Sequence, residues 1–133
     1  MSYSLLKKLT LVIFTYNRHN YLKRTLKYWS KYDIKIVVLD GSDVEFKDQS
    51  LNSKNFKYIH GPKDLYLRLL SSVNYVETEF MILGSDDEFY LPSGLISCVN
   101  FLSKNSSFSS CGGIALGFGK NEKKKFFAQE RYP

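Results

Sequence analysis

Three adjacent carboxylates, Asp86-Asp87-Glu88, follow a strand-like run at residues 79–83 and precede Pro92. Like charges in a row repel one another, so this tripeptide is a poor choice for a simple turn. A divalent cation would relieve the repulsion, and a cation held by one or two carboxylates keeps positions open for phosphate oxygens. The tripeptide therefore predicts a Mg²⁺ or Mn²⁺ site for a nucleotide diphosphate. The competing interpretation is a solvated acidic turn before a helix, whose dipole would favour Glu88.

The composition is that of an ordinary globular domain. At 133 residues, 44% apolar and 24% charged, the chain has the length of one domain with a core of its own. No apolar run approaches the roughly 20 residues that span a bilayer. Cys98 and Cys111 lack metal-site spacing, and we expect them to be reduced, buried thiols of a cytoplasmic protein.

The net charge of +6 is unevenly distributed along the chain. Residues 1–35 carry +7, residues 36–119 carry −4 and residues 120–133 carry +3. A basic rim around an acidic centre fits an anionic ligand bridged by a metal ion. It also fits peripheral contact with acidic lipid head groups at the inner face of a membrane. For most of the lysines, solvation is the simpler explanation. The absence of a nucleic-acid motif and of a single basic stripe argues against nucleic acid.

Apolar runs of strand length alternate with helical periodicity. Strands are predicted at residues 9–14, 34–39, 56–60, 80–83 and 111–118, and helices at residues 21–29, 65–73 and 92–102. Asn20 is the predicted N-cap of the first helix, and Leu69, Leu70 and Val73 lie on one face of the second. The first two strands are apolar almost throughout, which is typical of a parallel sheet buried on both faces. The order predicts one α/β domain over residues 1–133, a Rossmann-like, doubly wound, mostly parallel sheet with helices on both faces.

Four polar clusters each follow a predicted strand. They lie at residues 15–18, 40–43, 60–63 and 84–88. Ligands of open parallel sheets bind beyond the carboxyl ends of the strands. The four clusters should therefore converge on one edge, where turn chemistry alone does not explain them.

Three segments in this order resemble the nucleotide-sugar domain of family 2-type glycosyltransferases, which have the A-type glycosyltransferase fold. They are Leu9–Arg18 with its Thr-Tyr-Asn-Arg end, Ile36–Asp43 with its Asp-Gly-Ser turn, and Phe80–Phe89 with the acidic tripeptide. In that family an Asp-x-Asp motif holds the donor diphosphate through a metal ion. Asp86-Asp87-Glu88 departs from the strict motif, so Asp86-x-Glu88 and Ser85-x-Asp87 are both open registers.

The resemblance and the side-chain chemistry imply roles for residues after the first two strands. Asp40 would accept the imide N–H of a uracil-like base, and its competing role is a strand-end cap on its own backbone. Asp43 would reach the ribose or cap the loop. Thr15 and Tyr16 would line the base or ribose site, although Tyr16 also suits a packing role.

Basic residues are the candidates for the diphosphate. Arg18 would approach a phosphate together with the amides of the following helix, and the alternative is a surface arginine. Lys63 and Arg68 are candidates for the same diphosphate. For Arg68 we favour an exposed helix position. His60 is expected to be a strand-end histidine and not a ligand.

The implied reaction is metal-assisted transfer of a sugar from a nucleotide-diphosphate sugar to the hydroxyl of a saccharide or other acceptor. An inverting member would need a carboxylate base, which in the family comes from the acceptor half. No catalytic residue is assigned, because Glu122 and Glu130 have no recognisable context. We expect the chain to be the donor-binding half of a longer, truncated A-type fold, prone to self-association through an exposed sheet edge.

Three other functions remain open. One is a noncatalytic nucleotide-binding fragment. Another is a sugar nucleotidyltransferase, which would need a Gly-rich, basic phosphate loop where residues 15–18 stand. The third is a receiver-like signalling domain, which would need an acidic cluster near the first strand and an acceptor aspartate after the third, and neither is present in the sequence.

Overall fold

The computed structural model describes residues 3–120 and 126–132. The strands are β1 (Leu9–Thr15), β2 (Lys35–Asp40), β3 (Phe56–His60), β4 (Phe80–Ser85), β5 (Ala115–Lys120) and β6 (Phe126–Tyr132). The α-helices are α1 (His19–Trp29), α2 (Leu65–Ser72) and α3 (Pro92–Lys104), and short 3₁₀ turns occupy Tyr3–Lys8, Gln49–Leu51 and Val73–Tyr75. The chain divides into two compact units, residues 1–100 and 101–133.

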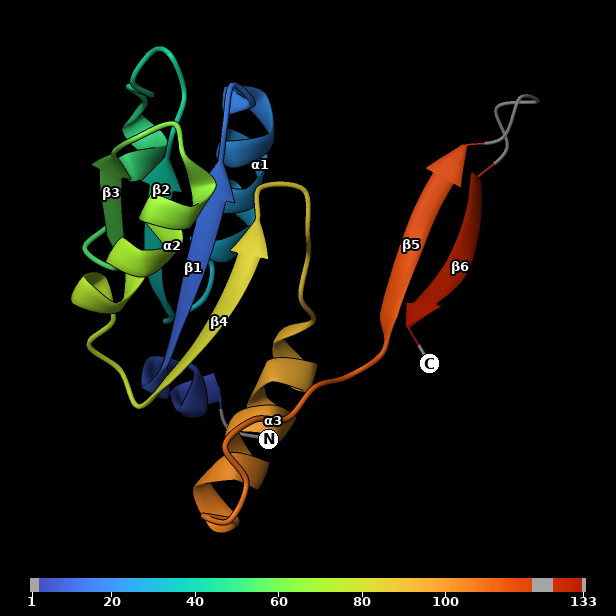
Figure 1. Cartoon of the computed structure of the whole chain (residues 1–133). Coiled ribbons are helices and arrows are strands. Elements are labelled where there is room, and N and C mark those ends of the chain that lie inside the picture. Colours follow the sequence, from blue (N-terminus) through green and yellow to red (C-terminus); the bar gives the residue numbers. More distant parts are fainter. Residues whose placement is uncertain (1–2, 121–125, 133) are drawn as a thin grey trace. The chain divides into compact units, whose positions relative to one another are not determined.

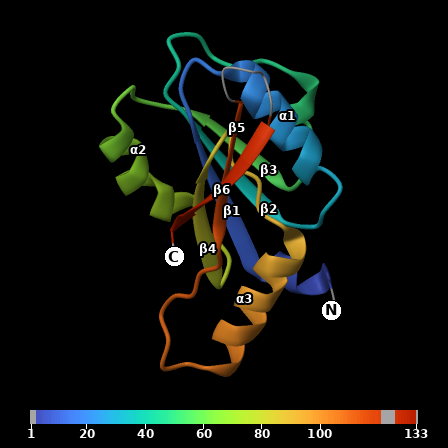
Figure 2. The ribbon, with the colours of Figure 1, turned by 90° about the vertical axis from the view of Figure 1, so that its right-hand side faces the viewer.

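The first unit is built on a parallel sheet with the strand order β3-β2-β1-β4 (Figure 1). Thr15 lies beside Asp40 and Phe14 beside Ser85, so the carboxyl ends of β1, β2 and β4 are level. Helix α2 lies on one side of the sheet and α1 on the other (Figure 2). The predicted α/β class and the Rossmann-like parallel sheet flanked by helices are confirmed. This arrangement puts the loops after β1, β2 and β4 at one edge.

The larger part of the core lies between the sheet and helices α1 and α3. Leu11 and Ile13 of β1 and Ile36 and Val38 of β2 pack there with Trp29 of α1, all at most 1% exposed. The alternate residues of the same strands form a smaller cluster on the α2 side of the sheet, made of Val12, Val37 and Leu39. Both faces of the central strands are therefore buried, which accounts for their continuous apolar sequence.

Apolar side chains remain exposed on the α2 side of the sheet. Leu70 of α2 and Val73 just after it belong to the expected apolar face and are 53% and 66% exposed, whereas the buried residues of α2 are Arg68 and Ser72. On β4, Met81 and Leu83 are 40% and 45% exposed, whereas their neighbours Phe80 and Ile82 pack against the larger core. The polar positions of α2 thus face the protein.

Helix α1 begins earlier than predicted. Its N-cap is Arg18, whose carbonyl accepts the amides of Tyr21 and Leu22, so the predicted cap Asn20 lies inside the first turn. The backbone of Asn17 has a φ of 52°, the left-handed conformation that asparagine tolerates better than most residues. This residue turns the chain after β1 and lets the helix begin directly at His19.

The second unit contains an antiparallel pair, β5 with β6. The predicted strand at residues 111–118 corresponds to β5, which begins later, at Ala115, and pairs only with β6 among the described strands. Strand β5 ends at Lys120, and residues 121–125 lie outside the described residues. Cys111 is exposed and Cys98 half-buried, so the prediction of a buried thiol is wrong for Cys111, which lies in an irregular segment before β5. None of the helices in the described part combines the length and hydropathy that crossing a bilayer requires.

Candidate functional site

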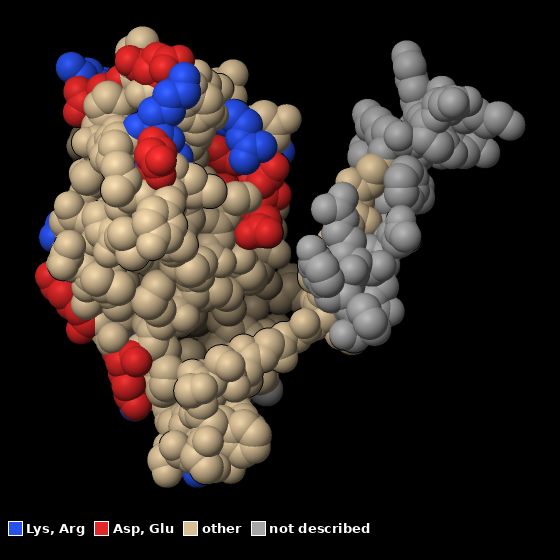
Figure 3. Space-filling view, viewed as in Figure 1, with Lys and Arg blue, Asp and Glu red and all other residues tan. Residues whose placement is uncertain are grey.

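Acidic and basic side chains lie side by side at the end of the first unit toward which β1 and β4 point (Figure 3). Hydrogen bonds and ion pairs join the four polar clusters there. Thr15 contacts Asp86, His60 contacts the carbonyl of Ser42, and Lys63 lies near Asp43. The expected convergence at the carboxyl ends of the strands is therefore present in the structure.

One arginine bridges two carboxylates at this edge. Asp86, just past β4, has no exposed side-chain surface, and its Oδ2 accepts the hydroxyl of Thr15 at 2.5 Å. The guanidinium of Arg18 pairs with Asp86 Oδ1 through Nη2, and its Nε donates to Oδ2 at 3.3 Å. The Nη1 of Arg18 donates to Asp87 Oδ2 at 2.9 Å, and the hydroxyl of Ser85 donates to the other oxygen of Asp87. We call Arg18, Asp86 and Asp87 the arginine–aspartate cluster.

Burial, hydrogen bonds and neighbouring charges together set the pKa values of this cluster. Burial raises the pKa of Asp86, against the hydroxyl of Thr15 and the charge of Arg18, which lower it. The hydroxyl of Ser85 and then Arg18 lower the pKa of Asp87, although burial opposes them. Burial alone would lower the pKa of Arg18, but the charge of Asp86 and the contacts with Asp87 raise it. The cluster is thus a buried carboxylate and a half-exposed one sharing a single cation.

Glu88 has other partners. Its Oε2 accepts the backbone amide of Ser85 at 3.1 Å and the hydroxyl of Tyr90 at 3.0 Å. Those bonds close the turn after β4, so this carboxylate holds the loop. Across the described residues, no group of three His, Cys, Asp or Glu side chains is placed to hold a metal ion. Of the three predicted ligands, Asp86 and Asp87 are the two that already share a cation.

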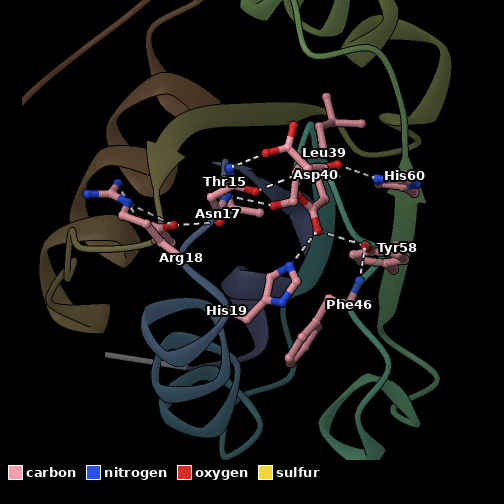
Figure 4. A network of polar contacts seen from close by, with 12 residues as sticks. Thr15, Asn17, Arg18, His19, Leu39, Asp40, Phe46, Tyr58 and His60 are labelled. Atoms are coloured by element: carbon pink, nitrogen blue, oxygen red, sulfur yellow. Dashed lines mark hydrogen bonds and ion pairs between the residues drawn. The ribbon is translucent and has the colours of Figure 1, made fainter.

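Asp40 is the centre of a second network (Figure 4). It is fully buried at the end of β2, and its Oδ1 accepts the amide of Ser42 at 2.8 Å. Its Oδ2 accepts the hydroxyl of Tyr58 at 2.7 Å and lies 3.5 Å from Nε2 of His19. The Tyr58 oxygen in turn accepts the amide of Phe46 at 2.8 Å. This is the strand-end cap that competed with recognition of a nucleobase, and a base would reach Asp40 only after one of these partners moved.

Arg68 is buried, and its interpretation as an exposed helix residue is wrong. Its side chain crosses the ends of two strands, where Nη1 donates to the carbonyls of Thr15 at 2.8 Å and Leu39 at 2.9 Å. Its Nη2 donates to the carbonyl of Lys63 at 3.3 Å. The space exists because Gly41 has no side chain, since a Cβ there would lie 2.7 Å from Cζ of Arg68. The guanidinium of Arg68 thus donates these hydrogen bonds to main-chain carbonyls.

Tyr16, Asn17, Asp43 and Lys63 form a more exposed group at the same edge. The side-chain amide of Asn17 donates to Asp43 Oδ2 at 2.7 Å, and Asn17 Oδ1 accepts the amide of Asp43 at 3.0 Å. The Nζ of Lys63 lies 3.7 Å from Asp43 Oδ1 and 5.0 Å above the ring of Tyr16. The bond from Asn17, followed by the charge of Lys63, lowers the pKa of Asp43. This group ties the loop after β1 to the loop after β2.

Several residues of the site were not predicted from the sequence. His19 and Tyr58 contact Asp40, and the hydroxyl of Thr25 donates to the backbone carbonyl of Asp86 at 2.7 Å. Asn17 carried a usable signal, because an asparagine between a buried strand and a helix suits a left-handed turn. Tyr58 and Thr25 carried none, because their partners lie far away in the sequence.

No protein-family model matches the chain, and a search of curated proteins finds no match. The resemblance to family 2-type glycosyltransferases therefore rests on the residues quoted for it and stays a prediction.

Proposed function

We propose that this chain is the donor-binding domain of a glycosyltransferase, which transfers a sugar from a nucleotide-diphosphate sugar to an acceptor hydroxyl. The observation that carries the proposal is the arginine–aspartate cluster at the carboxyl end of β4. Burying a carboxylate is costly unless it is paired, and this pair lies at the edge where open parallel sheets bind their ligands. A purely structural acid would be equally useful anywhere else in the fold.

A divalent cation suits Asp86 and Asp87 better than it suits all three acids. Asp86 Oδ1 is buried and is paired with the guanidinium of Arg18, and Oδ2 of Asp87 is turned toward the same guanidinium. Mg²⁺ is typically bound by one or two carboxylates together with substrate phosphates and water. When bound, the ion would stabilise the charge that develops on the departing diphosphate.

The positions of the other residues support a division of labour. Arg18 borders a hollow of ≈ 410 Å³ lined by residues 17–21 at the start of α1, where backbone amides and a guanidinium favour phosphate. Asp43 and Lys63 are exposed and Tyr16 is half-buried, and in this proposal these side chains would contact the nucleoside. A larger hollow of ≈ 580 Å³, lined by residues including Lys23 and Asp48, contains none of the arginine–aspartate cluster, so we do not assign the donor to it.

Two of the predicted ligand-binding residues receive a supporting role in this proposal. Arg68 and Asp40 hold the ends of β1 and β2 through bonds to the chain itself. Their contribution is to fix the loops that carry Tyr16 and Asp43. The acceptor base is not assigned: Glu122 lies outside the described residues, and Glu130 belongs to β6.

Calorimetric titration with uridine diphosphate tests the proposal. We expect binding in Mg²⁺ or Mn²⁺ and at least a tenfold loss in EDTA, which corresponds to about 1.4 kcal/mol. Asp87→Asn should cause a similar loss, because it removes one of the two carboxylates assigned to the ion. Asp87 is 43% exposed, so its replacement should disturb the fold less than replacement of the buried Asp86. The matched control is Asp33→Asn, whose carboxylate pairs with Lys7 away from the site.

The outcomes separate the parts of the proposal. Equal affinity with and without EDTA would remove the metal ion and leave a nucleotide site. Absence of binding to uridine, adenosine and guanosine diphosphates in the presence of Mg²⁺ would remove the donor-binding function itself.

A further inference from the structure

Arg18 does for Asp86 and Asp87 what a bound cation would do. Its guanidinium reaches three oxygens of the two carboxylates, and it supplies the ion pair that neutralises the buried Asp86. Its own side chain is 42% exposed, in contrast to the fully buried carboxylate that it contacts. Arg18 and Asp87 therefore have open space beside them, and of the three residues only Asp86 is enclosed.

The guanidinium and a divalent cation compete for the same oxygens. Asp86 Oδ1 and Asp87 Oδ2 are the atoms with which Arg18 is paired, and Asp86 and Asp87 are also the carboxylates to which the proposed function assigns the metal ion. Two positive groups a few ångströms apart repel strongly in a partly buried site, because the local dielectric screens them less than water does. Entry of the metal ion therefore favours departure of the guanidinium.

The surroundings give Arg18 a place to go. The hollow lined by residues 17–21 lies beside it, and the Tyr21 ring, 45% exposed, has its centroid 5.5 Å from Cζ of Arg18. A guanidinium keeps part of its stabilisation over an aromatic face. A diphosphate next to that hollow would offer it new bidentate partners.

We infer that Arg18 is a displaceable counter-ion, which neutralises Asp86 and Asp87 while the site is empty and exchanges these carboxylates for the donor diphosphate when the divalent cation binds. The inference rests on the proposed donor-binding function. It has a thermodynamic consequence, because the metal ion alone must displace Arg18 with nothing in return. Metal ion and diphosphate should therefore bind cooperatively, each raising the affinity for the other.

Mn²⁺ alone, without nucleotide, is the direct probe, and electron paramagnetic resonance measures its free concentration. We expect Arg18→Gln to bind Mn²⁺ about tenfold more tightly than the wild type, since the competing charge is gone. The matched control is Arg24→Gln. Arg24 lies on the same helix and contacts the rings of Tyr21 at 4.9 Å and Phe89 at 5.1 Å, and its removal should leave the Mn²⁺ affinity unchanged. Equal affinity of the wild type and Arg18→Gln would overturn the inference.

A wild-type measurement covers the case in which Arg18→Gln fails to fold. The Nε–Hε resonance of Arg18, assigned by its loss in Arg18→Lys, is followed during titration with Mg²⁺ and then uridine diphosphate. We expect Mg²⁺ to shift this resonance and to speed its exchange with water, and the nucleotide to protect it again. A resonance that stays unchanged at saturating Mg²⁺ and nucleotide would show a fixed arginine and overturn the inference. If the wild type binds uridine diphosphate with Mg²⁺ in that experiment, the donor-binding function survives the failure.

Discussion

Replacing Gly41 with alanine should destabilise the protein through a residue distant in the sequence, Arg68. The φ of Gly41 is not in the left-handed region, so alanine is conformationally permitted there. By itself, such a change stabilises a protein by about 0.4–1 kcal/mol, because it restricts the unfolded chain. The new Cβ, however, would lie 2.7 Å from Cζ and 2.8 Å from Nε of the Arg68 side chain, closer than carbon atoms approach.

The cost follows from what Arg68 must give up when it moves. Its Nη1 bonds to the carbonyls of Thr15 and Leu39 are 2.8 and 2.9 Å long and buried. A hydrogen bond from a charged donor is worth about 1.5–3 kcal/mol, and Thr15 keeps a second donor in the amide of Gly41. Loss of one to two such bonds, less the gain from alanine, gives a net destabilisation of about 0.5–5.6 kcal/mol, with a central value of about 3 kcal/mol.

Urea denaturation followed by the fluorescence of Trp29, the only tryptophan and fully buried, measures this free energy of unfolding. Arg68→Ala should itself be destabilising, and in that background Gly41→Ala should be neutral or slightly stabilising. The matched control is Gly94→Ala in α3, where a Cβ meets nothing within 4 Å and about 0.5–1 kcal/mol of stabilisation is expected. If the costs of Gly41→Ala and Arg68→Ala simply add, the guanidinium is not the cause and the reasoning is refuted.

Three further predictions concern other parts of the first unit. Tyr58→Phe removes a hydroxyl that donates to Asp40 and accepts a backbone amide, and it should lower the free energy of unfolding by about 1–3 kcal/mol; an unchanged urea midpoint would contradict this. The pKa of Asp48 is lowered from 3.8 to about 2, chiefly by its bond from Lys23, so its stabilising effect is complete above pH 3.8 and is lost as the pH falls toward 2. Lys23→Met should raise that pKa toward its ordinary value in an NMR titration of the carboxyl carbon, and an unshifted titration would exclude Lys23 as the cause. The protein should self-associate at micromolar concentration through the exposed apolar side chains of β4, which include Met81. Met81→Lys should therefore lower the average particle mass measured by light scattering. A wild-type protein that is monomeric at all concentrations would argue against association through β4.

The parts of the fold that could be predicted depend on local patterns. The apolar runs of β1 and β2 indicate strands buried on both faces, and their positions before polar clusters indicate where those clusters meet. The strand at residues 115–120 was also visible as a pattern, but its partner was not. Pairing is a property of two distant segments, and nothing in one strand names the other.

The candidate site was predicted less fully because its contacts depend on space and direction. The sequence around Arg68 is that of an exposed, leucine-rich helix, and only the absent side chain of Gly41 makes room for the guanidinium. The ion pairs of Arg18 with Asp86 and Asp87 depend on the left-handed turn at Asn17, which brings the start of α1 close to the end of β4. Residue types indicate which side chains could bind a ligand or a metal ion, but not which of those side chains already bind one another in the folded protein.

The guanidinium that crosses the ends of β1 and β2 has a consequence for recombination. Arg68 lies 53 residues after Thr15 and 29 after Leu39. The hydrogen bonds that hold the ends of β1 and β2 therefore come from a later part of the chain. A chimaera joined between Gly41 and Arg68 would combine a glycine and an arginine of different ancestry, and any mismatch would release both loops together. Crossovers before Thr15 or after α2 would take Gly41, Arg68 and the carbonyls that Arg68 binds from one parent. The natural module for exchange is therefore the block from β1 to α2, and not the individual strand–helix pair.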